Sequence, residues 1–314
     1  MEPIGWFFLF LAATALIVLF GVNKGIEKVS RVMMPVLVVL ILFVSIYACC
    51  MPGAWEGVLY YITPDLSRFS YKTVVAAMGQ LFYSMSLAMG IMITYGSYMK
   101  KEVNLETSVH QIEIFDTGIA FLAGLMVVPS VFAFSGGTAE ALGQGPGLMF
   151  VTLPKVFDSM PGGGAIGAIF FLLVLFAALT SSISLMETIV STLADKLHWN
   201  RRVCCLVVFV FSLLLGIPSS LGNGLWSGFL LLGKDILSFF DFISNSVLMP
   251  IVALLTCIFV AYVVKTKPIE EEVEGSAPFR AKRLFQVVIR YVAPVCILII
   301  LVTSVLGAFG IISI

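Results

Sequence analysis

The stretch Gly79-Gln80-Leu81-Phe82-Tyr83-Ser84-Met85-Ser86-Leu87-Ala88-Met89-Gly90 places polar and small residues at the centre of an apolar segment. Serine hydroxyls compete for backbone hydrogen bonds, and glycine lowers helix propensity. The stretch therefore predicts a helix that unwinds near the middle of a membrane, where irregular backbone is tolerated only if it lines protein or a water-filled cavity. The alternative is a continuous helix that packs through its small residues against a neighbour, and the stretch alone favours neither.

The whole chain has the composition of a membrane protein. Of its 314 residues, 60% are hydrophobic and 11% are charged, and the formal net charge is zero. A soluble domain usually has about 45–50% apolar and about 25% charged residues. This difference excludes a soluble enzyme, a disordered chain and a nucleic-acid-binding protein. The sequence also lacks a nucleotide-binding loop, a hydrolase motif and a zinc-ligand spacing, so we expect neither an enzyme nor any catalytic residue.

Eight apolar stretches are long enough to cross a bilayer, which takes about 20 helical residues. They cover residues 6–22, 33–51, 73–98, 112–135, 163–193, 203–219, 236–264 and 286–311. Backbone groups in lipid must be satisfied within the segment, so these stretches are expected to be helices. The sequence therefore predicts an all-α polytopic membrane protein.

Positive charge is distributed unevenly between the connections. The odd connections, counted from the first stretch, hold fourteen of the 18 Lys and Arg residues, and the even ones hold four. By the positive-inside rule, the odd connections lie in the cytoplasm and the start of the chain lies outside. We expect a multi-pass protein of the plasma (inner) membrane.

The fifth apolar stretch carries hydroxyl groups on one face. Ala177, Thr180, Ser181 and Ser184 recur at the i, i+3, i+4, i+7 spacing of a helix. Hard oxygen ligands without carboxylates suit a monovalent alkali cation better than a divalent one. The alternative is ordinary helix packing, in which the hydroxyls bond to carbonyls of their own helix.

Two carboxylates lie near the ends of apolar stretches. Asp116 lies about one turn into the fourth stretch, where a charge is costly and is a functional candidate, unless it sits in the cytoplasmic headgroup zone. Asp241 and Asn245 form a polar pair, one helical turn apart, near the outer start of the seventh stretch.

Several of these segments resemble the neurotransmitter:sodium symporter family, in particular its bacterial amino-acid members with the leucine-transporter (LeuT-type) fold. Asn23 to Lys28, with Met33-Met34-Pro35, resembles the start of the family's fifth helix. Tyr61 to Asp65 resembles the extracellular stretch before helix six, and Gln80 to Gly90 with Ile93 to Tyr98 resembles helix six itself. Leu179-Thr180-Ser181-Ser182-Ile183 resembles the signature of helix eight. The motifs occur in the family's order over essentially the whole chain.

The resemblance implies a single transmembrane domain over residues 1–314, with the inverted-repeat fold that is known for broken helices and binding at the midplane. Residues 1–52 would end the first repeat as helices four and five, 73–265 would form the second repeat as helices six to ten, and 286–311 would be helix eleven. Helices one to three would be missing, with half of the substrate site and the arginines of the gates. We therefore expect that this chain alone does not catalyse coupled uptake, and that the missing N-terminal helices or another protomer would complete it.

The family's functional residues carry over motif by motif. The resemblance assigns one sodium ion to Ala177, Thr180 and Ser181, and a second to Ser84 and Asp116. It assigns the amino-acid substrate to Tyr83, Ser84, Ser86, Met89, Ser181 and Leu185. It assigns the cytoplasmic gate to Ser97, Tyr98 and Asp195, and the outer gate to Asp241.

This chain departs from the family's usual residues at Tyr83, at Ala88 and at Asp116 with the following Ala120. Tyr83 stands where Phe is usual, and Ala88 where Gly is common. Asp116 stands where Asn is common, and Ala120 follows where chloride-dependent relatives have Ser. Because the Asp116 carboxylate would lie near the chloride position, we expect transport that does not require chloride.

The expected function is sodium-coupled symport of an amino acid by alternating access. Met89 and Leu185 would make an adaptable apolar pocket, which favours a neutral, hydrophobic or aromatic side chain. The alternative is a non-transporting membrane scaffold or regulatory subunit derived from the same fold. That alternative predicts a stable partner protein and no sodium-dependent ligand binding.

Overall fold

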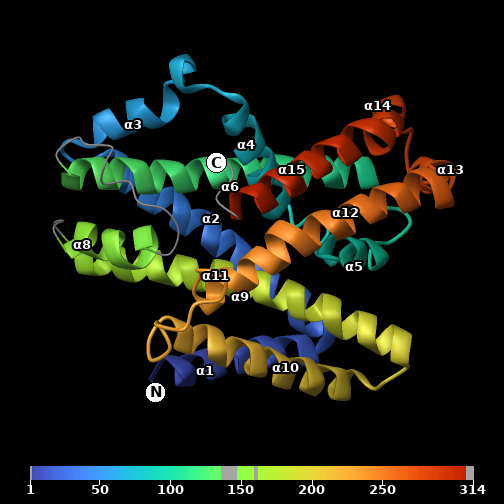
Figure 1. Cartoon of the computed structure of the whole chain (residues 1–314), viewed down its shortest axis with the longest axis horizontal. Helices are drawn as coiled ribbons and strands as arrows, with labels where there is room; N and C mark the ends of the chain where they lie inside the picture. The colour runs from blue at the N-terminus through green and yellow to red at the C-terminus, as the bar shows by residue number, and fades with distance from the viewer. Residues whose placement is uncertain (1, 136–146, 159–161, 309–314) are drawn as a thin grey trace. The chain divides into compact units, whose positions relative to one another are not determined.

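The computed structural model describes residues 2–135, 147–158 and 162–308, and most of them are helical (Figure 1). The α-helices are α1 (Glu2–Leu19), α2 (Glu27–Cys49), α3 (Ala54–Ile62), α4 (Tyr71–Ser84), α5 (Ile91–Ser97), α6 (Leu105–Ser135), α8 (Leu153–Asp158), α9 (Gly163–Leu197), α10 (Arg201–Gly222), α11 (Ile236–Asp241), α12 (Met249–Ile258), α13 (Lys267–Glu274), α14 (Lys282–Val287) and α15 (Ala293–Ala308). Wider π-helical turns join α11 to α12 over Phe242–Leu248 and α14 to α15 over Val288–Val292. The prediction of an all-α chain is confirmed.

Among the described residues, six helices are long and apolar enough to cross a membrane. They are Glu27–Cys49, Leu105–Phe134, Gly163–Leu197, Arg201–Gly222, Ile236–Val264 and Lys282–Gly307. The prediction of eight such helices is not confirmed. The first predicted stretch forms a shorter apolar helix, Pro3–Leu19, which ends before Gly21 in the left-handed conformation (φ 80°). The third is divided in two.

The division of the third stretch falls in the segment singled out by its sequence. Helix α4 ends at Ser84 and α5 begins at Ile91. Between them, Ser86, Ala88 and Gly90 have φ values of 54°, 61° and 78°. Left-handed residues cannot continue a right-handed helix. The prediction of an unwound helix is therefore confirmed, and the continuous alternative is wrong.

The unwound segment is fixed by its hydrogen bonds and by one close approach. The Leu87 N–H donates to the Phe82 carbonyl (3.2 Å), and the helical pattern resumes where the Thr94 N–H donates to the Gly90 carbonyl (2.9 Å). A Cβ atom at Gly90 would lie 2.9 Å from Thr188 Cγ2. Glycine is therefore favoured at position 90 for two reasons: it adopts left-handed backbone without strain, and it has no Cβ atom to collide with Thr188.

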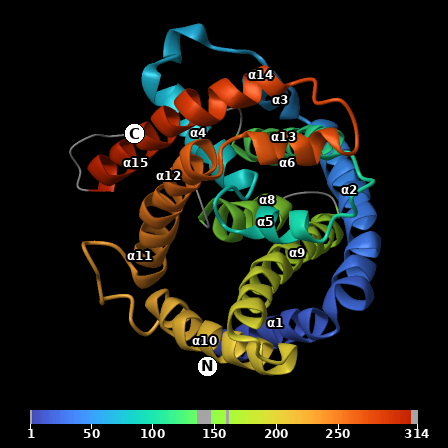
Figure 2. The ribbon, with the colours of Figure 1, turned by 90° about the vertical axis from the view of Figure 1, so that its right-hand side faces the viewer.

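The described chain forms two compact units. The first contains Met1–Leu19, Phe69–Glu113 and Ser184–Ile314. Within it α1 packs along α10, as Figures 1 and 2 both show, and the rings of Phe8 and Phe209 meet edge to face at 5.6 Å. Helices α4, α12 and α15 pack together around a buried apolar cluster, whose members are Phe82, Met249, Ala253, Cys257 and Ile297.

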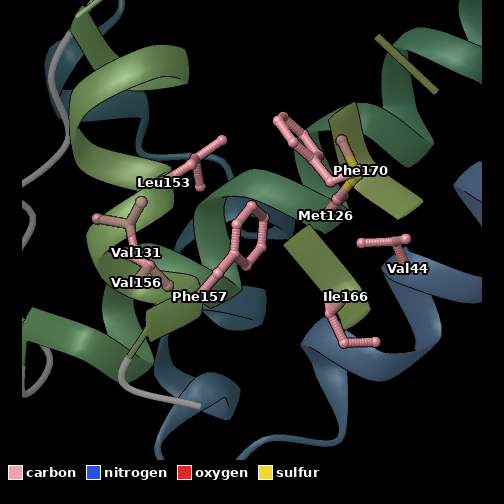
Figure 3. Packing of buried hydrophobic residues seen from close by; sticks show 8 residues of the cluster. All are labelled: Val44, Met126, Val131, Leu153, Val156, Phe157, Ile166 and Phe170. Atoms are coloured by element: carbon pink, nitrogen blue, oxygen red, sulfur yellow. The ribbon is translucent and has the colours of Figure 1, made fainter. Parts of the chain in front are cut away.

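The second unit contains Phe20–Arg68 and Ile114–Ile183. Its core is a cluster from α2, α6, α8 and the first half of α9 (Figure 3), made of Val44, Met126, Val131, Leu153, Val156, Phe157, Ile166 and Phe170. Gly57 of α3 lets that helix approach α6 so closely that a Cβ atom would lie 2.8 Å from Pro129 Cα. Such close contacts at small residues favour helix association in lipid, where helices are not driven together by the hydrophobic effect.

These units do not test the predicted division into residues 1–52, 73–265 and 286–311. That division follows a repeat of helices, whereas the units are defined by contacts. The repeat assignment stays a prediction.

Candidate functional site

The unwound segment and the end of α4 carry four of the predicted substrate residues. Tyr83 is 50% exposed, and Ser84, Ser86 and Met89 are partly buried. Met89 packs in part against the apolar cluster between α4, α12 and α15. Ser84 is the last residue of α4, where the carbonyl end of a helix carries partial negative charge. A cation is therefore favoured at this end of α4.

A cavity of about 560 Å³ borders the unwound segment inside the first unit. Ser86, Leu87, Ala88 and Gly90 contribute to it, and its other walls come from α4, α5, α12 and the helix that runs from α14 into α15. The lining is almost wholly apolar. Of the predicted substrate residues, only Ser86 lines it.

The hydroxyl face of α9 has the oxygens that the sequence predicts as cation ligands. Thr180 Oγ1 donates to the carbonyls of Phe176 (3.1 Å) and Ala177 (3.0 Å). This is the packing arrangement expected from the alternative interpretation. A hydroxyl that donates its hydrogen still has acceptor lone pairs, so this arrangement does not by itself exclude a cation. Ser181 and Leu185, one helical turn apart, are both exposed.

Further along, α9 binds the short helix α5 through two tyrosines. Tyr95 Oη and Ser184 Oγ are 2.7 Å apart, and Tyr98 Oη donates to Glu187 Oε1 at 2.7 Å. The two tyrosines are three residues apart, as are the two residues that they contact. Residues with this spacing share one helix face, so the two helices match each other by register.

Glu187 is fully buried and is paired with Arg201, the first residue of α10. The guanidinium donates to both carboxylate oxygens, from Nη1 at 3.2 Å and from Nη2 to Oε2. It also donates to the Val18 carbonyl at the end of α1, at 3.1 Å from Nε and 2.7 Å from Nη2. The Tyr98–Glu187–Arg201 network therefore connects α5, α9, α10 and α1.

The predicted cytoplasmic gate is only partly brought together. Tyr98 takes part, but its partner is Glu187. Asp195 is exposed and lies eight residues further along α9, about 12 Å from Glu187 along the helix axis. Ser97 is also exposed and donates to the Thr94 carbonyl of its own helix at 2.7 Å. Gate roles for Ser97 and Asp195 stay predictions.

The polar pair predicted near the start of the seventh apolar stretch is present. Asn245 Nδ2 donates to Asp241 Oδ1 at 2.6 Å, and Asp241 is exposed. The pair holds the carboxylate at the surface of α11, consistent with its assignment to an outer gate. Its gate role is untested.

The second predicted sodium site has one residue in each unit. Ser84 belongs to the first unit, and Asp116, which is partly buried on α6, belongs to the second. Ala177, Thr180 and Ser181 all belong to the second unit. A sodium ion shared by Ser84 and Asp116 stays a prediction.

Sequence reasoning did not assign a role to Glu187 and Arg201. A signal was present, since Glu187 lies seven residues after Thr180 on the same apolar helix, and an ionisable residue in such a helix marks a functional site. The next arginine along the chain is Arg201, at the start of the following helix. The family resemblance assigns the carboxylate of the cytoplasmic gate to Asp195 instead.

Comparison with known proteins gives a consistent result. The sequence profile of the "Sodium:neurotransmitter symporter family" matches residues 4–309. An uncharacterized sodium-dependent transporter of Haemophilus influenzae is 34% identical over 304 residues, covering 96% of this chain and 65% of that protein. A sodium-dependent transporter of Bacillus subtilis is 34% identical over 307 residues, covering 97% of this chain and 66% of that protein.

The fold is also similar to that of a solved crystal structure. The crystal structure of MhsT in complex with L-phenylalanine matches with a TM-score of 0.85 and 36% sequence identity. The match covers 96% of this chain and 68% of that one. The chain thus spans about two thirds of the length of the two bacterial relatives and of the MhsT chain.

Proposed function

The chain belongs to the sodium:neurotransmitter symporter family, and from this premise we propose that it serves the sodium-coupled symport of a neutral, hydrophobic or aromatic amino acid. The observation that carries the proposal is the break between Ser84 and Ile91. Such a break exposes backbone amides and carbonyls at membrane depth, and these groups can bind the ammonium and carboxylate of an amino acid.

Sodium binding is assigned to two sets of oxygens. In the first, the Ala177 carbonyl and the Thr180 hydroxyl already lie 3.0 Å apart, and Ser181 follows on the same helix. In the second, Ser84 at the carbonyl end of α4 and the Asp116 carboxylate would hold the other ion. Neutral oxygens with at most one carboxylate suit a monovalent ion.

The side chain of the substrate would contact Met89 and Leu185. Both are apolar, and the flexible thioether of Met89 adapts to irregular shapes. The L-phenylalanine in the MhsT structure supports an aromatic substrate, since that chain is 36% identical to this one. Tyr83 adds a hydroxyl beside Ser84, where it can reach a polar group or a water.

The Tyr98–Glu187–Arg201 network would close the site on its cytoplasmic side. By the distribution of Lys and Arg, the connections that begin at Tyr98 and that precede Arg201 are cytoplasmic, and the start of the chain is outside. A network that ties α5 to α9 and α10 holds this end shut, and its opening would release the amino acid inward. Asp241 would act at the outer side.

Because this chain alone is expected to be inactive, the proposal is tested with the chain fused to the N-terminal helices of a full-length bacterial relative. The measurement is uptake of labelled phenylalanine by bacteria that express this fusion. We expect uptake that disappears when sodium is replaced by choline, that leucine and tryptophan inhibit, and that lysine and glutamate do not. Replacing chloride by gluconate should leave the rate unchanged if Asp116 makes chloride unnecessary. Sodium-independent uptake would contradict the proposal, as would a stable partner protein with no sodium-dependent binding.

The activity of the isolated polypeptide is a separate question. These 314 residues are expected not to accumulate amino acid by themselves, and this stays a prediction. Sodium-driven accumulation by proteoliposomes that contain only this polypeptide would contradict it. That result would leave the proposed function itself intact.

A further inference from the structure

The loop between α10 and α11 exposes five large apolar side chains. The exposed fractions are 84% for Leu225, 47% for Trp226, 57% for Phe229, 57% for Leu230 and 70% for Leu232. The sequence from Asn223 to Gly233 contains no Asp, Glu, Lys or Arg. We call the segment Leu225–Leu232 the apolar loop.

The backbone of the apolar loop is ordered by hydrogen bonds. The Trp226 N–H donates to the Leu221 carbonyl (2.9 Å), and the Phe229 N–H donates to the Trp226 carbonyl (2.8 Å). Leu231 and Lys234 exchange two backbone bonds of 2.8 and 3.0 Å, which closes a tight turn. The exposed side chains therefore project from a backbone that is held by its own hydrogen bonds.

The tip of that turn holds a leucine in an unfavourable conformation. Leu232 has a φ of 50°, and Gly233 follows with 74°. Left-handed backbone is common for glycine and rare for a branched apolar residue. Leu232 is 70% exposed, so packing within the chain does little to compensate for this conformation.

The base of the loop is polar and closed. Gly222 and Ile236 meet there, since a Cβ atom on Gly222 would lie 3.1 Å from Ile236 Cβ. Asp235 accepts hydrogen bonds from the Ser238 hydroxyl (2.6 Å) and N–H (3.0 Å), and these bonds lower the pKa of Asp235. Its charge therefore persists at the base, beside Lys234, and the segment is amphipathic from base to tip.

The loop joins two helices that are long and apolar enough to span a membrane, Arg201–Gly222 and Ile236–Val264. Its place is thus at a boundary between membrane and water, where tryptophan is enriched. We propose that the apolar loop inserts into the headgroup region of the adjacent leaflet, roughly 5–10 Å deep, as interfacial amphipathic segments do. The inserted loop anchors the start of α11, which carries Asp241. This inference depends on the membrane spans and is independent of transport.

Fluorescence of Trp226 in lipid nanodiscs tests the insertion. Trp6, Trp55 and Trp199 are exposed and can be replaced by Phe, which leaves Trp226 as the sole tryptophan of the sequence. We expect blue-shifted emission that lipids brominated near the headgroup quench more strongly than lipids brominated at the chain end. Quenching by aqueous iodide without quenching by either lipid would overturn the proposal, because the loop would be solvated. If neither iodide nor either brominated lipid quenches Trp226, the proposal would also be overturned, because the loop would then be covered by protein.

A charged substitution on the same background gives a second, independent measurement. Leu225→Asp should reduce quenching by the headgroup-brominated lipid and shift emission to the red, because a carboxylate opposes insertion. Leu225→Met is the matched control and should leave both unchanged. Leu225 is 84% exposed, so neither variant disturbs the core. Equal quenching in the two variants would contradict the proposal.

Discussion

Removing the Arg201 guanidinium should destabilise the protein through the carboxylate that it leaves behind. The Glu187 side chain is fully buried, whereas the Arg201 side chain is 30% exposed. In Arg201→Met the buried carboxylate keeps the Tyr98 hydroxyl bond and loses both guanidinium bonds. An uncompensated buried charge of this kind costs about 3–5 kcal/mol. At about 2.1 cal/mol/K per residue, the 314 residues have an unfolding entropy of about 0.66 kcal/mol/K, so the melting temperature should fall by about 5–8 °C.

The assay is thermal unfolding of the detergent-purified protein, and a second substitution identifies the cause. Glu187→Gln in the Arg201→Met background removes the buried charge, so the double variant should recover part of the loss. Arg202→Met is the matched control, because Arg202 is exposed, and should stay within about 0.5 kcal/mol of the parent. This prediction is contradicted if Arg201→Met has the same melting temperature as Arg202→Met. It is also contradicted if the double variant has a lower melting temperature than Arg201→Met.

Three further predictions concern single residues. Ala88→Gly should raise the free energy of unfolding by roughly 0.5–1 kcal/mol. Glycine removes the strain of a left-handed alanine (about 1–2 kcal/mol), and this gain exceeds the entropy cost of glycine (about 0.4–1 kcal/mol). An unchanged or lower melting temperature would contradict this prediction. Gly57→Ala should lower stability by about 1–3 kcal/mol, since its Cβ would meet Pro129 at 2.8 Å, and the same melting assay checks it. Hydrogen bonds led by that from Gln286 (2.7 Å) lower the pKa of Glu270 below 4.5, so its stabilising effect is present above that pH and is lost as pH falls through the lowered value. The protection factors of the α13 amides, which are corrected for the intrinsic pH dependence of exchange, should fall on that descent, and Glu270→Gln should abolish this change.

The break in the third apolar stretch was predictable because its cause is local. Serine and glycine weaken a helix wherever they occur, and Ser86 and Gly90 do adopt left-handed backbone. Ala88 also does so, although alanine is the best helix former. Its conformation follows from its two neighbours and from packing against α12 and α15, which no local pattern contains.

The number of membrane-spanning helices was harder to predict. Apolarity alone does not distinguish a continuous helix from two half-helices. The stretch 73–98 is expected to be one crossing, and it is not among the six long helices because α4 and α5 are both short. The first predicted stretch, residues 6–22, also extends past the end of α1 at Leu19, because its apolar composition does not reveal that Gly21 has a left-handed backbone. Hydropathy reports the solvent around a segment, whereas backbone conformation decides where its helix ends.

Partners across the fold were the least predictable part of the site. The Asp241–Asn245 pair follows from helical spacing, and the structure contains it at 2.6 Å. The pairing of Glu187 with Arg201 and with Tyr98 joins separate helices, and sequence spacing does not say which helix faces are neighbours. The charge of Glu187 within an apolar helix could have marked it as a candidate, but only the packing of α5, α9 and α10 supplies its partners.

The sodium dependence of amino-acid uptake by Thr180→Val decides whether the hydroxyl face of α9 binds the coupling ion, and it is measured on this chain fused to the N-terminal helices of a full-length relative. Valine keeps the shape of threonine and removes its oxygen, while Ser182→Ala removes a neighbouring hydroxyl that bonds to Leu179 within the helix. We expect the sodium concentration for half-maximal uptake to rise about tenfold or more in Thr180→Val, and to stay at the parent value in Ser182→Ala. An unchanged sodium dependence in Thr180→Val, with uptake intact, would contradict the assignment of sodium to this face.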